Sequence, residues 1–170
     1  MTTGQPTPAR VPITDDIPLE DLLARYLAGP ALVRETIAGM DAEQLRARPI
    51  PDKMSTHSVV AHIVDSEHGL GGRLRRAIAG EEPAPSQGGH PEIAIDPERD
   101  LEYELESLET ARTQMAEELR QAPPEVWERT ALRLRDRELT VRQGLVLMTR
   151  HLEGHVAAIE EKRAALGLQA

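Results

Sequence analysis

Apolar residues return every three or four positions along four long stretches of the chain, which is the period of a helix with one buried face. The first stretch begins at Leu19, the second follows Ser55, the third covers about residues 98–121 and the fourth covers residues 141–166. Residues 130–139 instead alternate apolar and polar side chains, as an extended segment does. Four long helices, with one long loop between the second and the third, predict an all-α fold, an antiparallel four-helix bundle.

Polar and small residues mark the expected helix ends. Ser55 and Thr140 precede the second and fourth helices and can cap them with their side-chain hydroxyls. Gly80 and Gly167 follow the same two helices, at the position where a residue with positive φ commonly ends a helix. Asp16 is the residue expected to cap the first helix.

Proline and glycine divide the rest of the chain. Gly29-Pro30 predicts a kink or an interruption in the first helix. The segment 81–97 holds four prolines and two adjacent glycines, so we expect a long loop that serves as a lid or as the rim of a site. Residues 1–16 are expected to form a flexible arm, which leaves residues 17–168 as a single domain.

Composition narrows the classes of function. The 170 residues include no Cys, which excludes disulfides, cysteine-rich zinc modules and a thiol nucleophile supplied by this chain. A net charge of −9 and a total of one Trp, two Tyr and no Phe argue against nucleic acid as a partner. The 20 basic residues comprise 18 arginines and only Lys53 and Lys162 as lysines, an imbalance that we interpret as codon bias.

The sequence contains no segment typical of a membrane protein or an exported one. No stretch approaches the roughly 20 apolar residues of a membrane-spanning helix. Residues 1–13 lack the apolar centre of a secretory signal. We therefore expect no membrane partner and take the cytoplasm as the simplest location.

Two histidines of the last predicted helix suggest chemistry. His151 and His155 are four residues apart, so their imidazoles lie on one helical face within reach of a single ion. Neutral imidazole is a common ligand of Zn²⁺, Ni²⁺ and similar divalent metals. The spacing also fits two hydrogen-bonded core histidines. It is not the H-E-x-x-H pattern of zinc proteases, because Leu152 occupies the position of the catalytic Glu.

A third histidine strengthens the metal interpretation. His62 flanks the apolar stripe of the second predicted helix. Three histidines from two helices can hold an ion and leave a coordination position open, as a catalytic metal requires. Asp65 and Glu67 follow His62 closely and are candidates for orienting a ligand imidazole through a hydrogen bond. The alternative for both is a carboxylate on a solvated helix face.

The other three histidines have simpler interpretations. We expect His57, His68 and His90 to be surface residues. His90 lies in the proline-rich loop and would reach the site only if that loop folds over it.

Several short motifs, in this order, resemble the DinB/YfiT superfamily of DinB-like metalloenzymes. They are Lys53-Met54-Ser55, the segment 62–67, Arg73, and the segment 150–155 followed by Ile159. The resemblance covers about residues 19–166. It implies an antiparallel four-helix bundle with a divalent metal, and it places the ligands at His62, His151 and His155. The family usually has Trp where this chain has Met54.

The resemblance implies two kinds of chemistry on a small-molecule substrate. Some members are similar to hydrolases, and others transfer groups with a low-molecular-weight thiol such as bacillithiol or mycothiol. A thiol would have to come from a cofactor or substrate, because the chain has no Cys. Arg73, Arg76 and Arg150 are candidates for binding an anionic group of that molecule, and the alternative, which the abundance of arginine in this chain favours, is that they are surface residues. The alternative to an enzyme is a non-catalytic, stress-related bundle that binds a metal or a ligand.

Charge is unevenly distributed along the chain. Residues 92–118 hold ten acidic residues and two arginines, whereas residues 129–142 hold five arginines and two acidic residues. One interpretation is two solvated faces. The other is a homodimer in which the opposite patches meet, and the family resemblance supports it.

Overall fold

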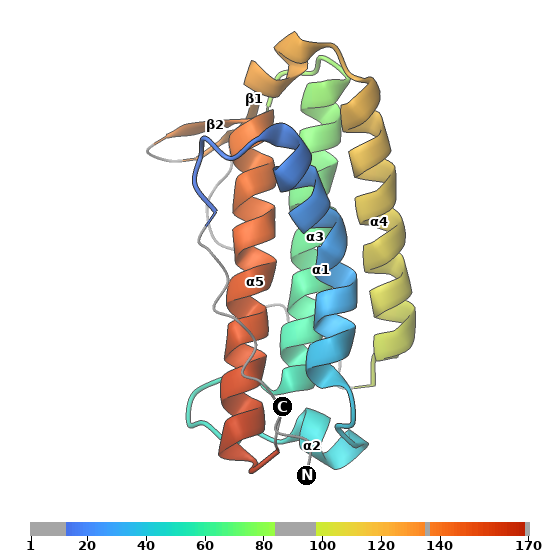
Figure 1. Cartoon of the computed structure of the whole chain (residues 1–170), viewed down its shortest axis with the longest axis vertical. Coiled ribbons are helices and arrows are strands. Elements are labelled where there is room, and N and C mark those ends of the chain that lie inside the picture. Colours follow the sequence, from blue (N-terminus) through green and yellow to red (C-terminus); the bar gives the residue numbers. More distant parts are fainter. Residues whose placement is uncertain (1–12, 84–97, 135–136, 169–170) are drawn as a thin grey trace.

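Four long helices pack side by side in the computed structural model, which describes residues 13–83, 98–134 and 137–168 (Figure 1). The four are α1 (Leu19–Ile37), α3 (Thr56–Ile78), α4 (Leu101–Gln121) and α5 (Val141–Ala165). The smaller elements at the bundle ends are α2 (Ala42–Arg46), the 3-10 helix η1 (Pro124–Glu128) and the antiparallel strands β1 (Thr130–Arg133) and β2 (Glu138–Thr140). The predicted all-α four-helix bundle is confirmed, and so is the extended segment near residues 130–139.

The directions of the helices give the bundle its topology. Arg163 in the last turn of α5 donates a hydrogen bond of 2.9 Å to the carbonyl of Ala38, directly after α1, so α1 and α5 run in parallel. Arg75 near the end of α3 pairs with Glu118 near the end of α4, so these two helices are also parallel. The two pairs run in opposite directions (Figure 1). Antiparallel packing therefore holds between the pairs and not within them.

This topology follows from the lengths of the connections. Short connections between helices produce antiparallel neighbours. α3 ends and α4 begins at opposite ends of the bundle, and residues 79–100 separate them in sequence. Residues 84–97 of this connection lie outside the described residues, so the expected lid or rim stays a prediction. Residues 1–12, most of the expected N-terminal arm, also lie outside them.

Most of the predicted helix ends are confirmed. The hydroxyls of Ser55 and Thr140 each accept a hydrogen bond from the backbone N–H three residues later. Gly80 and Gly167 have φ values of 85° and 72°, in the region that favours glycine. The prediction for the first helix was wrong, because Pro18 and not Asp16 directly precedes the helix and its carbonyl accepts the first helical bond, from Leu22.

Gly29-Pro30 lies inside α1 and does not end it, so the predicted interruption is absent. Both residues are buried. A Cβ atom on Gly29 would collide with the guanidinium of Arg112 and would lie 2.9 Å from Leu152 Cδ1. The glycine therefore allows α4 and α5 to approach α1 closely at this level of the bundle.

Two apolar clusters form the core, and a polar layer separates them. The upper cluster joins the first halves of α1 and α5 to the second halves of α3 and α4 and to the strands β1 and β2. Its members include Leu22, Leu74, Leu119, Leu132 and Leu145. The lower cluster packs Val59 and Ile63 of α3 against Leu152 and Val156 of α5. Glu67 on α3 and Arg112 on α4 each lie between the residues that their helix contributes to the lower cluster and those that it contributes to the upper cluster. Together with Tyr26, to which Glu67 is hydrogen-bonded, they form what we call the polar layer.

The packed part of the chain begins before residue 17, where the predicted domain begins. Ile13 is 3% exposed and belongs to the upper cluster. Arg150 Nε donates a hydrogen bond of 2.8 Å to its carbonyl. Within the described ranges, no helix is long and apolar enough to cross a membrane.

Candidate metal centre

The three predicted ligands meet between α3 and α5. His62 Nε2 lies 3.2 Å from His151 Nε2, and His155 Nε2 lies 3.1 Å from His151 Nε2. All three ligand nitrogens lie within 4.8 Å of one another, and all three side chains are half-buried. His151 is thus the central member of what we call the three-His cluster.

The sequence produces this convergence through helix geometry. His151 and His155 are one turn apart on α5, and the apolar residues beside them, Leu152 and Val156, anchor the helix in the lower cluster. Ile63 anchors α3 in the same cluster. The antiparallel packing of α3 against α5 then brings His62 opposite the pair.

The spacing fits a single ion. In a tetrahedral site with Zn–N bonds of about 2.0–2.1 Å, two ligand nitrogens lie about 3.3 Å apart, close to the two short Nε2–Nε2 distances here. An imidazole nitrogen has only one in-plane position, which carries either a proton or a lone pair. His151 Nε2 therefore cannot hydrogen-bond to both neighbours at once. One cation facing three lone pairs satisfies all three nitrogens, so the donor set suits a divalent metal, whose binding stays a prediction.

Electrostatics favours the ligand form of His155. Burial, together with the nearby His62 and the positive charge of Lys162, lowers the pKa of His155 from 6.5 to about 4. The imidazole is therefore neutral near pH 7, and its lone pair is available to a cation without loss of a proton.

The same shift predicts how the stability of the metal-free protein depends on pH. The unfolded chain binds a proton at His155 below about pH 6.5, whereas the folded chain binds it only near pH 4. The unfolded state therefore binds more protons in this window, and the free energy of unfolding should fall as the pH drops from about 6.5 towards 4. Urea unfolding at pH 7, 6 and 5 should show this fall, and it should be smaller in His155→Gln. Equal slopes in the two proteins would contradict it.

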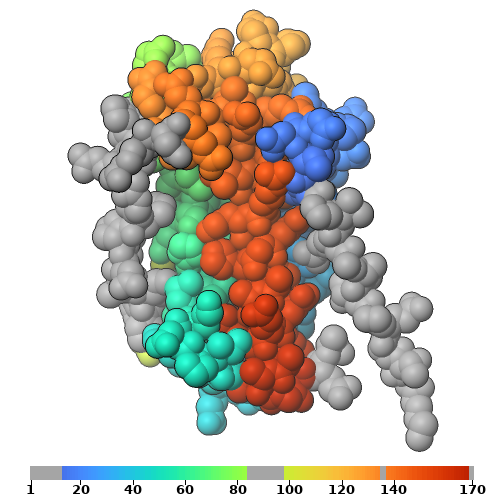
Figure 2. Space-filling model, turned by 90° about the vertical axis from the view of Figure 1, so that its left-hand side faces the viewer, coloured from blue at the N-terminus to red at the C-terminus, as the bar shows by residue number. Residues whose placement is uncertain are grey.

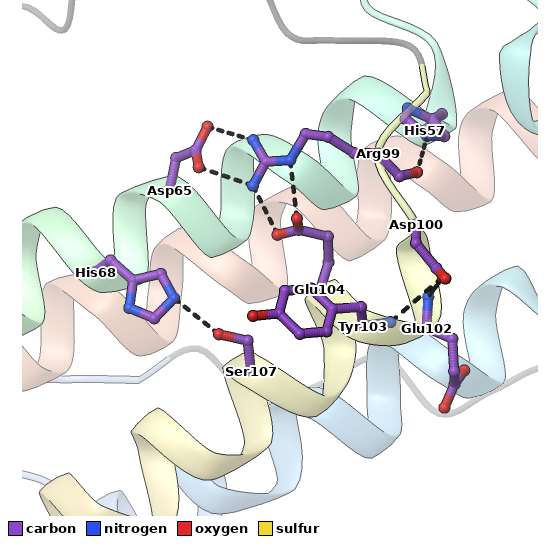
Figure 3. A network of polar contacts seen from close by, with 9 residues as sticks. All are labelled: His57, Asp65, His68, Arg99, Asp100, Glu102, Tyr103, Glu104 and Ser107. Carbon is purple, nitrogen blue, oxygen red and sulfur yellow. Dashed lines mark hydrogen bonds and ion pairs between the residues drawn. The ribbon is translucent and has the colours of Figure 1, made fainter.

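The two carboxylates predicted to orient an imidazole are held by arginines. Asp65 accepts hydrogen bonds of 2.8 and 2.9 Å from Arg99 (Figure 3). Glu67 is 5% exposed and accepts hydrogen bonds from Arg112 and from the hydroxyl of Tyr26. Glu67 also lines a narrow cleft together with His151. Both carboxylates thus neutralise buried or half-buried arginines, and an orienting role for Asp65 and Glu67 stays a prediction.

Neither Arg99 nor Arg112 was expected at this site from the sequence. Arg112 is 1% exposed and lies in the core register of α4, between Leu108 and Met115. A charged residue in the middle of an apolar stripe is a signal that a buried partner of opposite charge must exist. Arg99 precedes α4 and bridges α3 and α4 by binding both Asp65 and Glu104. The sequence carries no comparable signal for Arg99.

The three remaining histidines differ from one another. The prediction that His57 is a surface residue was wrong, because it is 4% exposed and its Nε2–H donates a hydrogen bond of 2.9 Å to the carbonyl of Arg99 (Figure 3). This contact fixes the start of α4 against the start of α3. His68 is exposed as predicted and pairs with Ser107. His90 lies outside the described residues.

The three arginines predicted to bind substrate are exposed, and they do not gather at one place, because Arg73 and Arg76 are neighbours one turn apart and Arg150 is on another helix, α5. Arg73 and Arg76 are on α3, and Arg76 pairs with Glu81. Arg73 is eleven residues after His62, which corresponds to about 16 Å along a helix. Arg150 binds the carbonyl of Ile13 and pairs with Asp15. Substrate binding by these arginines stays a prediction.

The uneven charge of the sequence is partly compensated within the fold. Arg34 of α1 pairs with Glu102 and Glu109 on α4. In the basic segment, Arg133 pairs with Glu138 and Arg129 donates to the carbonyl of Ile78. These contacts occupy charges on which the dimer hypothesis depends, and that hypothesis stays a prediction.

The fold and the site define a four-helix bundle protein with three histidines facing one another from two antiparallel helices. The chain belongs to the DinB superfamily, whose model matches residues 25–159. Among solved structures, YfiT from Bacillus subtilis is similar to it, with a TM-score of 0.78 and 18% sequence identity over 98% of this chain and 95% of that one. YfiT is described as a probable metal-dependent hydrolase with an unusual four-helix bundle topology. Comparison with curated proteins gives no match.

Proposed function

We propose that this protein is a metal-dependent hydrolase of a small molecule and that His62, His151 and His155 hold its divalent ion. The observation that carries the proposal is the convergence of the three Nε2 atoms, with separations of 3.1 and 3.2 Å around His151. Three protein ligands leave a coordination position for water or substrate. A divalent ion held there supplies a Lewis acid and lowers the pKa of a water molecule towards neutrality. The description of YfiT supports the same class of reaction.

The residues of the chain hold the three imidazoles in place and keep water away from part of the site. α3 and α5 fix the three imidazoles on two rigid helices, which holds a site more precisely than loops do. Ile63, Leu152 and Val156 each follow one of the three ligands directly in sequence and belong to the lower cluster, so this apolar cluster borders the site. The half-exposed side of the three-His cluster is left for the substrate.

A substrate screen with three arms tests the proposal. Protein stripped of metal and then loaded with Zn²⁺ or Ni²⁺ is assayed on ester and amide substrates, and on a haloaromatic electrophile with and without a low-molecular-weight thiol. We expect metal-dependent hydrolysis without thiol, lost in His151→Ala and retained in His68→Ala. Turnover only with added thiol would replace the hydrolase with the thiol-dependent transferase. No turnover in any arm by the metal-loaded protein would favour the non-catalytic binding bundle.

A further inference from the structure

Lys162 is a buried cation that the proposed hydrolysis does not use. Its side chain is 3% exposed, near the end of α5. An ammonium group has three hydrogen-bond donors, and the contact observed for Lys162 Nζ within the described part of the chain is one bond of 3.0 Å to the carbonyl of Ala158. Burying a charge with so few partners is costly, so such a residue calls for a functional explanation.

Lys162 lies on the same side of α5 as the three-His cluster. It is seven residues after His155, which places the two on one helical face. Side chains on a helix lean towards its N-terminus, so the ammonium group points back towards His155. The structure agrees, because Nζ donates a hydrogen bond to the carbonyl of Ala158, one turn back towards His155.

The second lysine of the chain is close to the first. Burial and the charge of Lys53 lower the pKa of Lys162, and the exposed Glu161 opposes them. The segment that leads into α3, which contains Lys53, lies beside the C-terminal half of α5 (Figure 2). In a chain with 18 arginines and two lysines, the segment that contains one lysine thus lies beside the helix that carries the other. The ammonium group of a lysine is a compact point charge, whereas the guanidinium group of an arginine is planar and spreads its charge over several atoms.

Three nearby carboxylates are paired with arginines, whereas Glu161 is exposed to solvent. Asp65 pairs with Arg99, and Glu67 pairs with Arg112. Glu153, between the two α5 histidines, pairs with Arg25 at 2.7 Å. A divalent ion on three neutral imidazoles would add two further positive charges at this place. The site would then carry a net positive charge, which favours a ligand with an anionic group.

We propose that Lys162 is an anion-binding residue of the three-His centre, which therefore takes a small molecule with an anionic group held between the ion and this ammonium. The inference rests on the proposed function and names its substrate class. It also moves the anion-binding role from the exposed arginines to a buried lysine, where a low dielectric strengthens the attraction.

Anion titration of the Co²⁺-loaded protein tests the inference. Azide and acetate are added separately, and binding is followed by the visible absorption of Co²⁺. We expect Lys162→Met, which removes the charge and keeps the length of the side chain, to bind both anions roughly 10-fold more weakly or worse. Co²⁺ content should stay at the wild-type level. The control is Arg163→Gln, which removes the same charge one residue away on another face, and it should bind anions as the wild type does.

The outcomes separate this inference from the proposed function. Wild-type protein that fails to bind Co²⁺ would overturn the metal centre itself. Normal Co²⁺ binding with equal anion affinity in wild type and Lys162→Met would overturn only the role of Lys162. Lys162→Met should unfold at the same temperature as wild type or higher, because it removes a buried charge. If it does not fold, Lys162→Gln takes its place with the same expected loss.

Discussion

Replacing His151 with alanine is expected to abolish divalent metal binding. His151 Nε2 is the nitrogen that lies close to both other ligands, so its loss leaves His62 and His155 without the central donor. Loss of a hydrogen-bond partner of a metal ligand already costs 10–100-fold in affinity. We therefore expect loss of the ligand itself to weaken Zn²⁺ binding by more than about 100-fold, as measured by competition with a chelator.

Thermal unfolding gives an independent measure of the same change. A ligand at 1,000 times its dissociation constant stabilises the folded state by about 4 kcal/mol. For a domain of this size that raises the unfolding temperature by roughly 10 °C. Zn²⁺ should produce this rise in wild type and in His68→Ala, whose histidine is exposed on α3, and none in His151→Ala. A wild-type rise in His151→Ala would contradict the assignment.

Replacing Arg112 with methionine is expected to cause the largest loss of stability. Arg112 Nε and Nη2 bind Glu67 Oε2 at 2.9 and 2.8 Å, and Nη1 donates to the carbonyl of Tyr26 at 2.7 Å. Its guanidinium also lies 4.3 Å from the centre of the Tyr26 ring. Removing it leaves Glu67 as a buried charge without its ion partner, which costs about 3–5 kcal/mol. Urea unfolding of the metal-free protein measures the loss.

A double variant shows whether the uncompensated charge is the cause. Glu67→Gln with Arg112→Met removes both charges, and the Gln carbonyl can still accept the hydrogen bond from Tyr26. Burial is the largest cause of the raised pKa of Tyr26 and is kept in the double variant, so its hydroxyl remains a donor. We expect the double variant to recover about 2 kcal/mol relative to Arg112→Met alone. A loss below about 1 kcal/mol in Arg112→Met would contradict the importance of the polar layer.

The local features of the fold could be predicted from the sequence. The caps at Ser55 and Thr140 depend on a few neighbouring residues, and the helical period is visible along each stretch. The three-His cluster could be predicted as well, since His151 and His155 share a face by helix geometry alone. His62 could be added as a candidate from its place beside the apolar stripe of its own helix, and the family resemblance then implied that all three histidines are ligands.

The features that depend on distant pairings could not be predicted. The parallel arrangement of α3 with α4 is set by which bundle ends the long connection joins, and no local pattern contains that information. The burial of His57 depends on its contact with the backbone of Arg99, which is 42 residues away in sequence. The carboxylates of Asp65 and Glu67 bind Arg99 and Arg112, which are also distant in sequence, so their partners could not be identified from the sequence around them.

Anomalous diffraction from crystals grown with Zn²⁺ tests most directly whether the three-His cluster is a metal centre. The geometry predicts one anomalous peak between α3 and α5, about 2.0–2.1 Å from the Nε2 atoms of His62, His151 and His155, with further density at an open coordination position. A map with no peak there, in which the three imidazoles are bonded to water or to one another at saturating Zn²⁺, would contradict it.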